Sequence, residues 1–343
     1  MRSLILIALA GAAAQLVDGG IGMGFGVTST TILLLAGLGP ATASAVVHTS
    51  ELGTTLVSGI SHWRFGNVHW PTVLKLGVPG GLSAFLGATV LSNLSLEAAA
   101  PVTSAILIAM GLNLVWRFSR LRPRAESAPR RRHSTPFLAG LGVVGGFIDA
   151  SGGGGWGPIS TSTLLAVGRE QPRRIVGTVN TAEFLVTFGA TAGFIVGLWD
   201  EIVANAAAVA ALLIGGTITA PVAAWLISRI NPTLLGGFVG TAIVALNLPR
   251  ALGWLLPHAV IVGLQVAVLV AGVGLTVWAT RRRKRLEKLV EKQEGSAQAQ
   301  PGTAREHGGQ HGGSRVVSST EPSSPAEANA TDQTASVTAG GRG

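Results

Sequence analysis

Four carboxylates lie inside long apolar stretches of this sequence, at Asp18, Glu51, Asp149 and Glu183. A charge at the centre of a bilayer costs at least ~2.5–3.5 kcal/mol, so such a side chain usually faces a cavity and serves a function. Apolar surroundings favour the neutral form of a carboxyl group, which suits groups that take up and release protons. For Asp18 and Asp149 a second interpretation stays open, in which the carboxylate caps broken helix backbone.

The two glutamates belong to matching polar faces on two apolar segments, 42–63 and 175–198. The first face has polar residues three or four positions apart, which predicts one face of a helix: Ser44, His48, Glu51, Thr55, Ser58 and His62. The second face carries Asn180, Glu183, Thr187 and Thr191. His48 could join a proton path. Its counterpart Asn180 does not titrate, so a neutral hydrogen-bonding role for this pair is the alternative.

Two matching glycine-rich stretches, 18–27 and 149–158, interrupt the apolar segments 4–35 and 137–167. A shift of 131 positions aligns their aspartates, three glycines and the aromatic pair Phe25 and Trp156. With one inserted residue, a shift of 132 then aligns Pro40 with Pro172, Thr49 with Thr181, Glu51 with Glu183 and Thr55 with Thr187. This agreement indicates an internal duplication. Paired interruptions of apolar segments in two halves are a sequence pointer to a transporter binding site.

Glycine-rich breaks suit the binding of a small anion. A broken helix leaves N–H groups free at the start of the segments 27–36 and 158–167, and Pro158 suits such a first turn. We expect the substrate-binding residues to be Gly22, Gly24, Gly26, Thr28, Ser29, Gly153, Gly155, Gly157, Ser160 and Thr161. The alternative is that the glycines only pack between helices. The two aromatics either line the site or pack in the core. A dinucleotide site would need a βαβ unit, and none is visible.

Composition places these residues in a membrane. Of 343 residues, 48% are hydrophobic and 12% are charged, against about 25% charged in soluble domains. The apolar runs 73–91, 98–116, 202–227 and 260–279 approach or exceed the roughly 20 residues that span a bilayer. The chain has no cysteine, which excludes disulfides and thiolate chemistry. The net charge of +9 reflects arginine clusters at membrane boundaries and not nucleic-acid binding.

The predicted fold is an all-α polytopic membrane protein with two inverted repeats. Each repeat has a Gly-rich re-entrant hairpin and about three transmembrane helices, giving seven full spans with one extra C-terminal helix. A parallel arrangement of broken, fully crossing helices is the alternative. Residues 1–14 resemble a signal peptide but are interpreted as the first membrane segment. The expected divisions are a first repeat at 1–118, an Arg-rich loop at 119–135, a second repeat at 136–250, a last span at 251–280 and a basic, then disordered tail at 281–343.

Charge also predicts the orientation. The central loop and the tail are both arginine-rich, and the positive-inside rule places them in the cytoplasm. The connections at 64 and at 173–174 are then cytoplasmic as well. A tight acidic turn is expected at 199–201, between two spans.

The motifs resemble those of the TauE/SafE sulfite-exporter family. They are Gly22-Met23-Gly24-Phe25-Gly26, Gly153-Gly154-Gly155-Trp156-Gly157, the 61–70 loop and the spaced glycines of 77–91. The resemblance covers about residues 5–280. It implies a secondary transporter of the plasma membrane that moves small sulfur-containing or organic anions, such as sulfite or sulfonates.

We therefore expect a secondary transporter that works by alternating access, with an anion site between the hairpins and proton coupling through the polar faces. Its proton-coupling residues would be Asp18, His48, Glu51, Thr55, Asp149, Asn180, Glu183 and Thr187. A passive anion channel and a non-transporting scaffold or receptor are the alternatives. No catalytic triad, Walker motif or His-x-x-Glu pattern appears, so no enzyme, cofactor or metal is expected. The expected partners are a small anion and the lipid bilayer, with a homodimer as one alternative.

Overall fold

The computed structural model describes residues 2–21, 23–120, 133–167, 170–227 and 231–298. Within these ranges the secondary structure is helical and contains no strand, which confirms the all-α prediction. Residues 1–291 form one compact unit, and residues 292–343 form a second. Most of the Arg-rich loop, at 121–132, and the tail predicted to be disordered, from 299 onward, lie outside the described residues.

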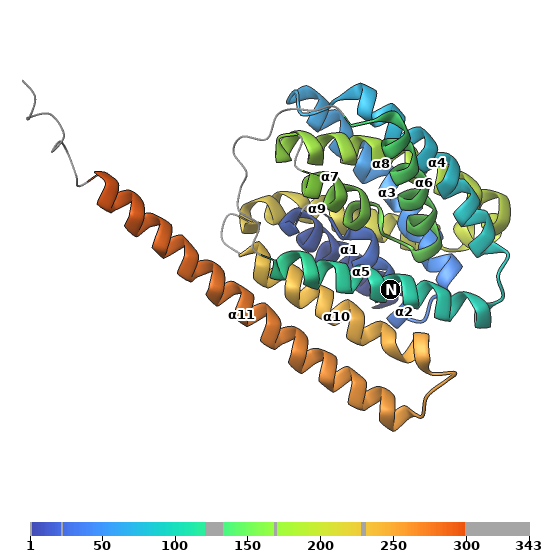
Figure 1. The fold of residues 1–343 in the computed structure, drawn as a ribbon. Helices are drawn as coiled ribbons and strands as arrows, with labels where there is room; N and C mark the ends of the chain where they lie inside the picture. The colour runs from blue at the N-terminus through green and yellow to red at the C-terminus, as the bar shows by residue number, and fades with distance from the viewer. Residues whose placement is uncertain (1, 22, 121–132, 168–169, 228–230, 299–343) are drawn as a thin grey trace, which may run out of the picture. The chain divides into compact units, whose positions relative to one another are not determined.

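The first half consists of a broken helix followed by three long helices (Figure 1). In order they are α1 (Arg2–Ile21), α2 (Phe25–Leu35), α3 (Pro40–Arg64), α4 (Trp70–Ser92) and α5 (Leu96–Ser119). Proline in the first turn of α3 and α4 fits their starts, since a missing N–H there costs nothing. Ser95 caps α5 by accepting a hydrogen bond from the Ala98 N–H at 3.3 Å.

The second half repeats this order and adds one helix. It contains α6 (Thr135–Gly152), a π-helical turn η1 (Gly157–Thr161), α7 (Ser162–Val167), α8 (Pro172–Ala204), α9 (Ala206–Ile227), α10 (Pro232–Leu252) and α11 (His258–Gln298). The predicted final span and the basic segment after it form one continuous helix, α11.

The expected acidic turn at 199–201 is wrong. Helix α8 continues through these residues and kinks at Leu198, where φ is −138° and ψ is 35°. The chain turns only at Asn205, whose backbone N–H donates to the carbonyl of Glu201 at 2.9 Å. Exposed acidic residues fit a solvated helix end as well as a turn, so their charge alone did not distinguish the two.

Five helices of the described part are long and apolar enough to cross a membrane, namely Trp70–Ser92, Leu96–Ser119, Arg173–Ala204, Thr233–Leu252 and His258–Leu286. Shorter apolar helices cover Leu4–Asp18, Phe25–Leu35 and Ala206–Ala220. The sequence count was seven full spans. The two spans that make the difference are α3 and α9. The polar face of α3 lowers its mean hydropathy, and only the portion Ala206–Ala220 of α9 is found as an apolar helix, which is too short to count as a span.

The two halves pack into each other and not side by side. Helix α1 of the first half packs along α9 of the second, and α6 of the second packs along α4 of the first. Two more of the large contacts join equivalent helices, α3 with α8 and α5 with α10, and another joins α4 with α8. Exchanging the halves keeps the first four pairings but turns α4 with α8 into the smaller contact of α3 with α9, so the duplication seen in the sequence has an approximate structural counterpart.

Equivalent helices α3 and α8 run antiparallel. His48 of α3 lies beside Phe194, with ring centroids 5.9 Å apart. Further along α3, the Thr55 hydroxyl lies 3.4 Å from that of Thr187, and Gly59 then faces Thr181. Residue numbers therefore increase along α3 in the direction in which they decrease along α8. The shift of 132 positions also aligns Thr55 with Thr187 in sequence. The axis that relates the two halves therefore passes between these two residues.

Two hydrophobic cores result from this packing, and each mixes the halves. The first joins α1, α2 and α5 with α9 and α10, around buried residues such as Leu33, Leu107 and Leu212. The second joins α4 with α6, α7 and α8, around Leu76, Trp156 and Phe194. Helix α3 contributes Ala43, Val46 and Val47 to the first core and Ala45 to the second.

Candidate functional site

The two glycine-rich breaks touch each other. A Cβ built on Gly26 would lie 2.8 Å from the Cα of Gly154. A Cβ built on Gly157 would lie 2.7 Å from the Cβ of Met23. The shift of 131 positions aligns Gly26 with Gly157 and Met23 with Gly154, so the two contacts are equivalent under the repeat. The sequence predicted that the breaks face each other across one site, and in the structure backbone meets backbone there.

Glycine is required in these breaks by backbone conformation as well as by space. Gly24, Gly153 and Gly154 have φ values of 123°, 70° and 147°, which side chains other than glycine rarely adopt. A Cβ on Gly154 would also overlap the backbone N of Val27. Gly155 is different, because its Cβ would have no neighbour closer than 3.4 Å. Gly22 lies outside the described residues.

The second break reverses the chain direction. A Cβ on Gly145 would lie 3.0 Å from the Ser160 hydroxyl, so η1 packs back against α6. Closer to the turn, the Trp156 N–H donates to Asp149 Oδ1 at 2.8 Å. Asp18 makes the equivalent interaction with the backbone N–H of Phe25. Both aspartates thus satisfy the backbone where a helix restarts, as the capping interpretation required.

The second oxygen of Asp149 faces a histidine from the other half. His48 Nε2 lies 3.0 Å from Asp149 Oδ2, and both side chains are buried. His48 Nδ1 lies 2.8 Å from the carbonyl oxygen of Ser44. That oxygen can only accept, so Nδ1 carries a hydrogen. The contact between Nε2 and Oδ2 then also needs a proton, held on one atom or the other. The two side chains thus share one proton in this contact.

The glutamates complete a cluster of four carboxylates. Glu51 is buried, with Oε1 3.2 Å from where a Gly26 Cβ would be. It is close enough to Asp149, Glu183 and Asp18 for the charges to interact, and Glu183 is close enough to both aspartates. Like charges that interact in a buried place repel one another strongly. Ionising all four carboxylates at once would therefore be costly.

The predicted hydroxyls divide into two groups. Those of Thr28, Ser160 and Thr161 are buried and have no hydrogen-bond partner within the described residues. Ser29 instead donates to the Phe25 carbonyl at 2.6 Å, inside its own helix. Thr55 likewise donates to the Glu51 carbonyl at 2.6 Å, and Thr187 to that of Glu183 at 3.1 Å. An orphaned buried hydroxyl is costly, and both breaks are followed by at least one, Thr28 after the first and Ser160 and Thr161 after the second, which points to a ligand or water at the breaks.

Asn180 lies away from this cluster. The shift of 132 positions aligns it with His48, but its Nδ2 lies 3.5 Å from Ser58 Oγ. Among the described residues it has no hydrogen bond to an aspartate. The site is therefore asymmetric, with a histidine in one half only. The described residues hold no group of three or more His, Cys, Asp or Glu arranged to bind a metal ion.

Several residues at the site were not predicted. Arg117 Nη1 lies 2.6 Å from Ser162 Oγ and 2.9 Å from Met23 Sδ, which brings a cation to both breaks. Thr30 donates to the carbonyl of Gly153, across the halves. Asn247 of α10 donates to Thr31 Oγ1 at 3.1 Å. The sequence signal for Arg117 was its place inside the last turn of an apolar span.

Fold and site together define a class, a multi-pass helical membrane protein whose halves bring two broken helices and a cluster of ionisable residues to one place. Sequence comparison gives the family. The chain belongs to the sulfite exporter TauE/SafE family, whose model matches residues 7–250. It is similar to a protein of Bacillus subtilis strain 168 named "Probable membrane transporter protein YtnM", with 45% identity over 252 residues. That match covers 72% of this chain and 82% of the relative. No solved structure matches the chain. The family resemblance seen in the motifs is thus confirmed.

Proposed function

We propose that this protein is a proton-coupled secondary transporter for a small sulfur-containing or organic anion of the sulfite or sulfonate kind. The observation that carries the proposal is the contact between the two glycine breaks beside three orphaned hydroxyls, of Thr28, Ser160 and Thr161. Hydroxyl donors, bare glycine backbone and the N-terminus of α2 suit a small oxyanion. The family description, a sulfite exporter, agrees with this substrate class, and the relative's name agrees with membrane transport.

Alternating access fits the arrangement of the repeats. Antiparallel packing of the equivalent helices α3 and α8 supports an inverted repeat, because the two then cross the bilayer in opposite directions. The reversal of the chain at Gly153–Gly155 supports a re-entrant hairpin. In transporters of this type the substrate lies near the midplane between the repeats, and each repeat closes one side in turn.

Proton coupling follows from charge. An anion beside four carboxylates is repelled unless some of them are protonated, so substrate and proton favour each other's binding. The pair of His48 and Asp149 shares one proton in its contact, and Glu51 is near both Asp149 and Gly26. We assign Glu51 and Glu183 as the groups that exchange protons with the two sides.

Orientation follows from the arginines. Arg120, at the end of α5, and Arg282, on α11, line one groove, so the central loop and the tail begin at the same end of these helices. The positive-inside rule then places both in the cytoplasm of a cell whose plasma membrane holds the protein.

Flux through purified protein in liposomes tests the proposal. Vesicles are supplied outside with sulfite, a sulfonate or a carboxylate, at equal pH and then with an acidic exterior. We expect uptake of at least one anion above its equilibrium level only when the exterior is acidic. Flux that equilibrates but ignores the pH gradient would indicate a channel. Absence of flux for every anion, with protein folded and inserted, would indicate a scaffold.

A further inference from the structure

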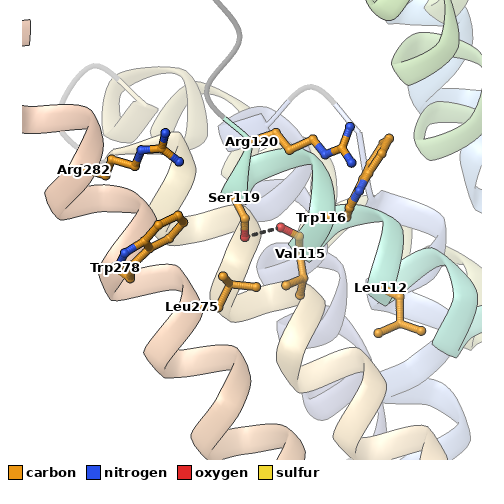
Figure 2. A pocket seen from close by; sticks show the side chains of 8 residues that line it. All are labelled: Leu112, Val115, Trp116, Ser119, Arg120, Leu275, Trp278 and Arg282. Atoms are coloured by element: carbon orange, nitrogen blue, oxygen red, sulfur yellow. Dashed lines mark hydrogen bonds between the residues drawn. The ribbon is translucent and has the colours of Figure 1, made fainter. Parts of the chain in front are cut away.

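A groove of about 730 Å³ lies between α5 and α11 (Figure 2). The side chains that line it are Leu112, Val115, Trp116, Ser119, Arg120, Leu275, Trp278 and Arg282. Figure 2 shows both arginines at the same end of the groove, with Leu112 and Leu275 toward the other end. The groove is therefore cationic at one end and apolar along the rest.

The cationic end is built from two matching pairs. On each helix an arginine follows a tryptophan by four residues. The Arg120 guanidinium lies 4.0 Å from the centre of the Trp116 ring, and that of Arg282 lies 5.2 Å from the Trp278 ring. Stacking on tryptophan holds each guanidinium in place but leaves its charge uncompensated. Within the part of the chain that the structure describes, neither has a carboxylate within 4.0 Å.

The position of these pairs matches a membrane boundary. Tryptophan favours the level of lipid headgroups, and arginines at helix ends extend to the same level. Below them, Val115, Leu112 and Leu275 lie where acyl chains run. Basic pockets between transmembrane helices are the usual recognition sites for acidic headgroups.

We propose that this groove binds one anionic phospholipid, with its phosphate between Arg120 and Arg282 and an acyl chain along Leu112, Val115 and Leu275. The lipid would join α11 to the rest of the protein through α5. Helix α11 already contacts α10, where Gln265 Nε2 donates to the Ala245 carbonyl at 2.9 Å and Arg283 Nη1 donates to Thr233 Oγ1 at 3.2 Å, and the lipid would add a contact with α5. The proposal depends on the membrane location of the chain and not on its substrate.

Full-length protein in detergent micelles tests this with phosphatidylglycerol or phosphatidylcholine of identical acyl chains. Two quantities are measured, the thermal unfolding midpoint and the number of retained lipids by native mass spectrometry. We expect phosphatidylglycerol to raise the midpoint more than phosphatidylcholine does. In the variant Arg120→Gln/Arg282→Gln this difference should vanish, with affinity lower by roughly thirtyfold for the two charges removed. Both arginines are exposed, so the substitutions leave the core intact.

The control removes the same charge outside the groove. Lys284→Gln/Arg285→Gln should keep the preference for phosphatidylglycerol, and an equal loss in this variant would overturn the proposal in favour of diffuse attraction. Equal stabilisation by glycerol phosphate alone would also overturn it, because the acyl chain would then play no part. A change of oligomeric mass in the groove variant, without change in retained lipid, would overturn it in favour of a second copy of the chain.

Discussion

His48 and Asp149 are 101 positions apart in sequence, yet Nε2 of one lies 3.0 Å from Oδ2 of the other in a buried place. The contact joins α3 of the first half to α6 of the second. It ties the hairpin of one half to the polar face of the other.

The first prediction concerns this pair. The substitutions His48→Gln and Asp149→Asn should be non-additive, since either one alone breaks the shared proton contact. We expect a coupling of about 1–3 kcal/mol in the free energy of unfolding, measured by denaturant titration in micelles. Asn180→Ala combined with Asp149→Asn serves as the control and should be additive. Additivity of the His48 and Asp149 substitutions would show that the contact carries no energy.

The second prediction contrasts two neighbouring glycines. Gly154→Ala should abolish anion flux, because its Cβ would overlap the Val27 backbone and its φ of 147° is unfavourable for alanine. Gly155→Ala should keep at least half of the flux, since its Cβ has room. Both variants are measured in the same liposome assay at equal protein incorporation. Equal flux from the two variants would mean that close contact of the breaks is not needed.

The third prediction concerns the orphaned hydroxyls. Thr28→Val, Ser160→Ala and Thr161→Val should raise the KM for the anion by about tenfold each, while unfolding stability changes little. No protein hydrogen bond is lost at these positions within the described residues. Ser29→Ala and Thr30→Val should behave in the opposite way, because both hydroxyls have partners. Their expected cost is ~0.5–1.5 kcal/mol of stability with KM unchanged.

The fourth prediction concerns the glutamates. Glu51→Gln and Glu183→Gln each mimic the protonated side chain, so substrate binding should persist. At least one variant should lose the acceleration of flux by an imposed pH gradient, because its group can no longer release a proton. Anion binding by calorimetry and flux at several pH gradients measure the two effects separately. An unchanged pH response in both variants would make these carboxylates structural and favour a channel.

The fifth prediction concerns topology. In this chain without cysteine, Arg124→Cys and Arg173→Cys should both be labelled from the cytoplasmic side by a membrane-impermeant maleimide. A re-entrant hairpin between the two positions returns the chain to the side from which it started. Labelling from opposite faces would instead mean that the segment crosses the bilayer fully.

Much of the fold could be predicted from local signals. Polar residues at helical spacing predicted α3 and α8, and the paired glycines predicted both breaks. The π-helical turn at Gly157–Thr161 and the kink at Leu198 could not be predicted, because both depend on packing against other helices. The same holds for the partner of His48, which is 101 positions away, and for the partners of Arg117, Met23 and Ser162, which are 94 and 45 positions away.

The mixed hydrophobic cores restrict which parts of the protein can swing as rigid levers. If residues 1–118 rocked as a block against residues 136–250, the interface of α1 with α9 and that of α4 with α6 would both shear. The parts that could move as rigid bodies without shearing these interfaces are the two cores, each built from both halves of the chain. Met23 and Phe25 belong to the first core and Trp156 to the second. Any motion of one core against the other would therefore take place at the glycine breaks, and it would be limited by α3, which contributes residues to both cores.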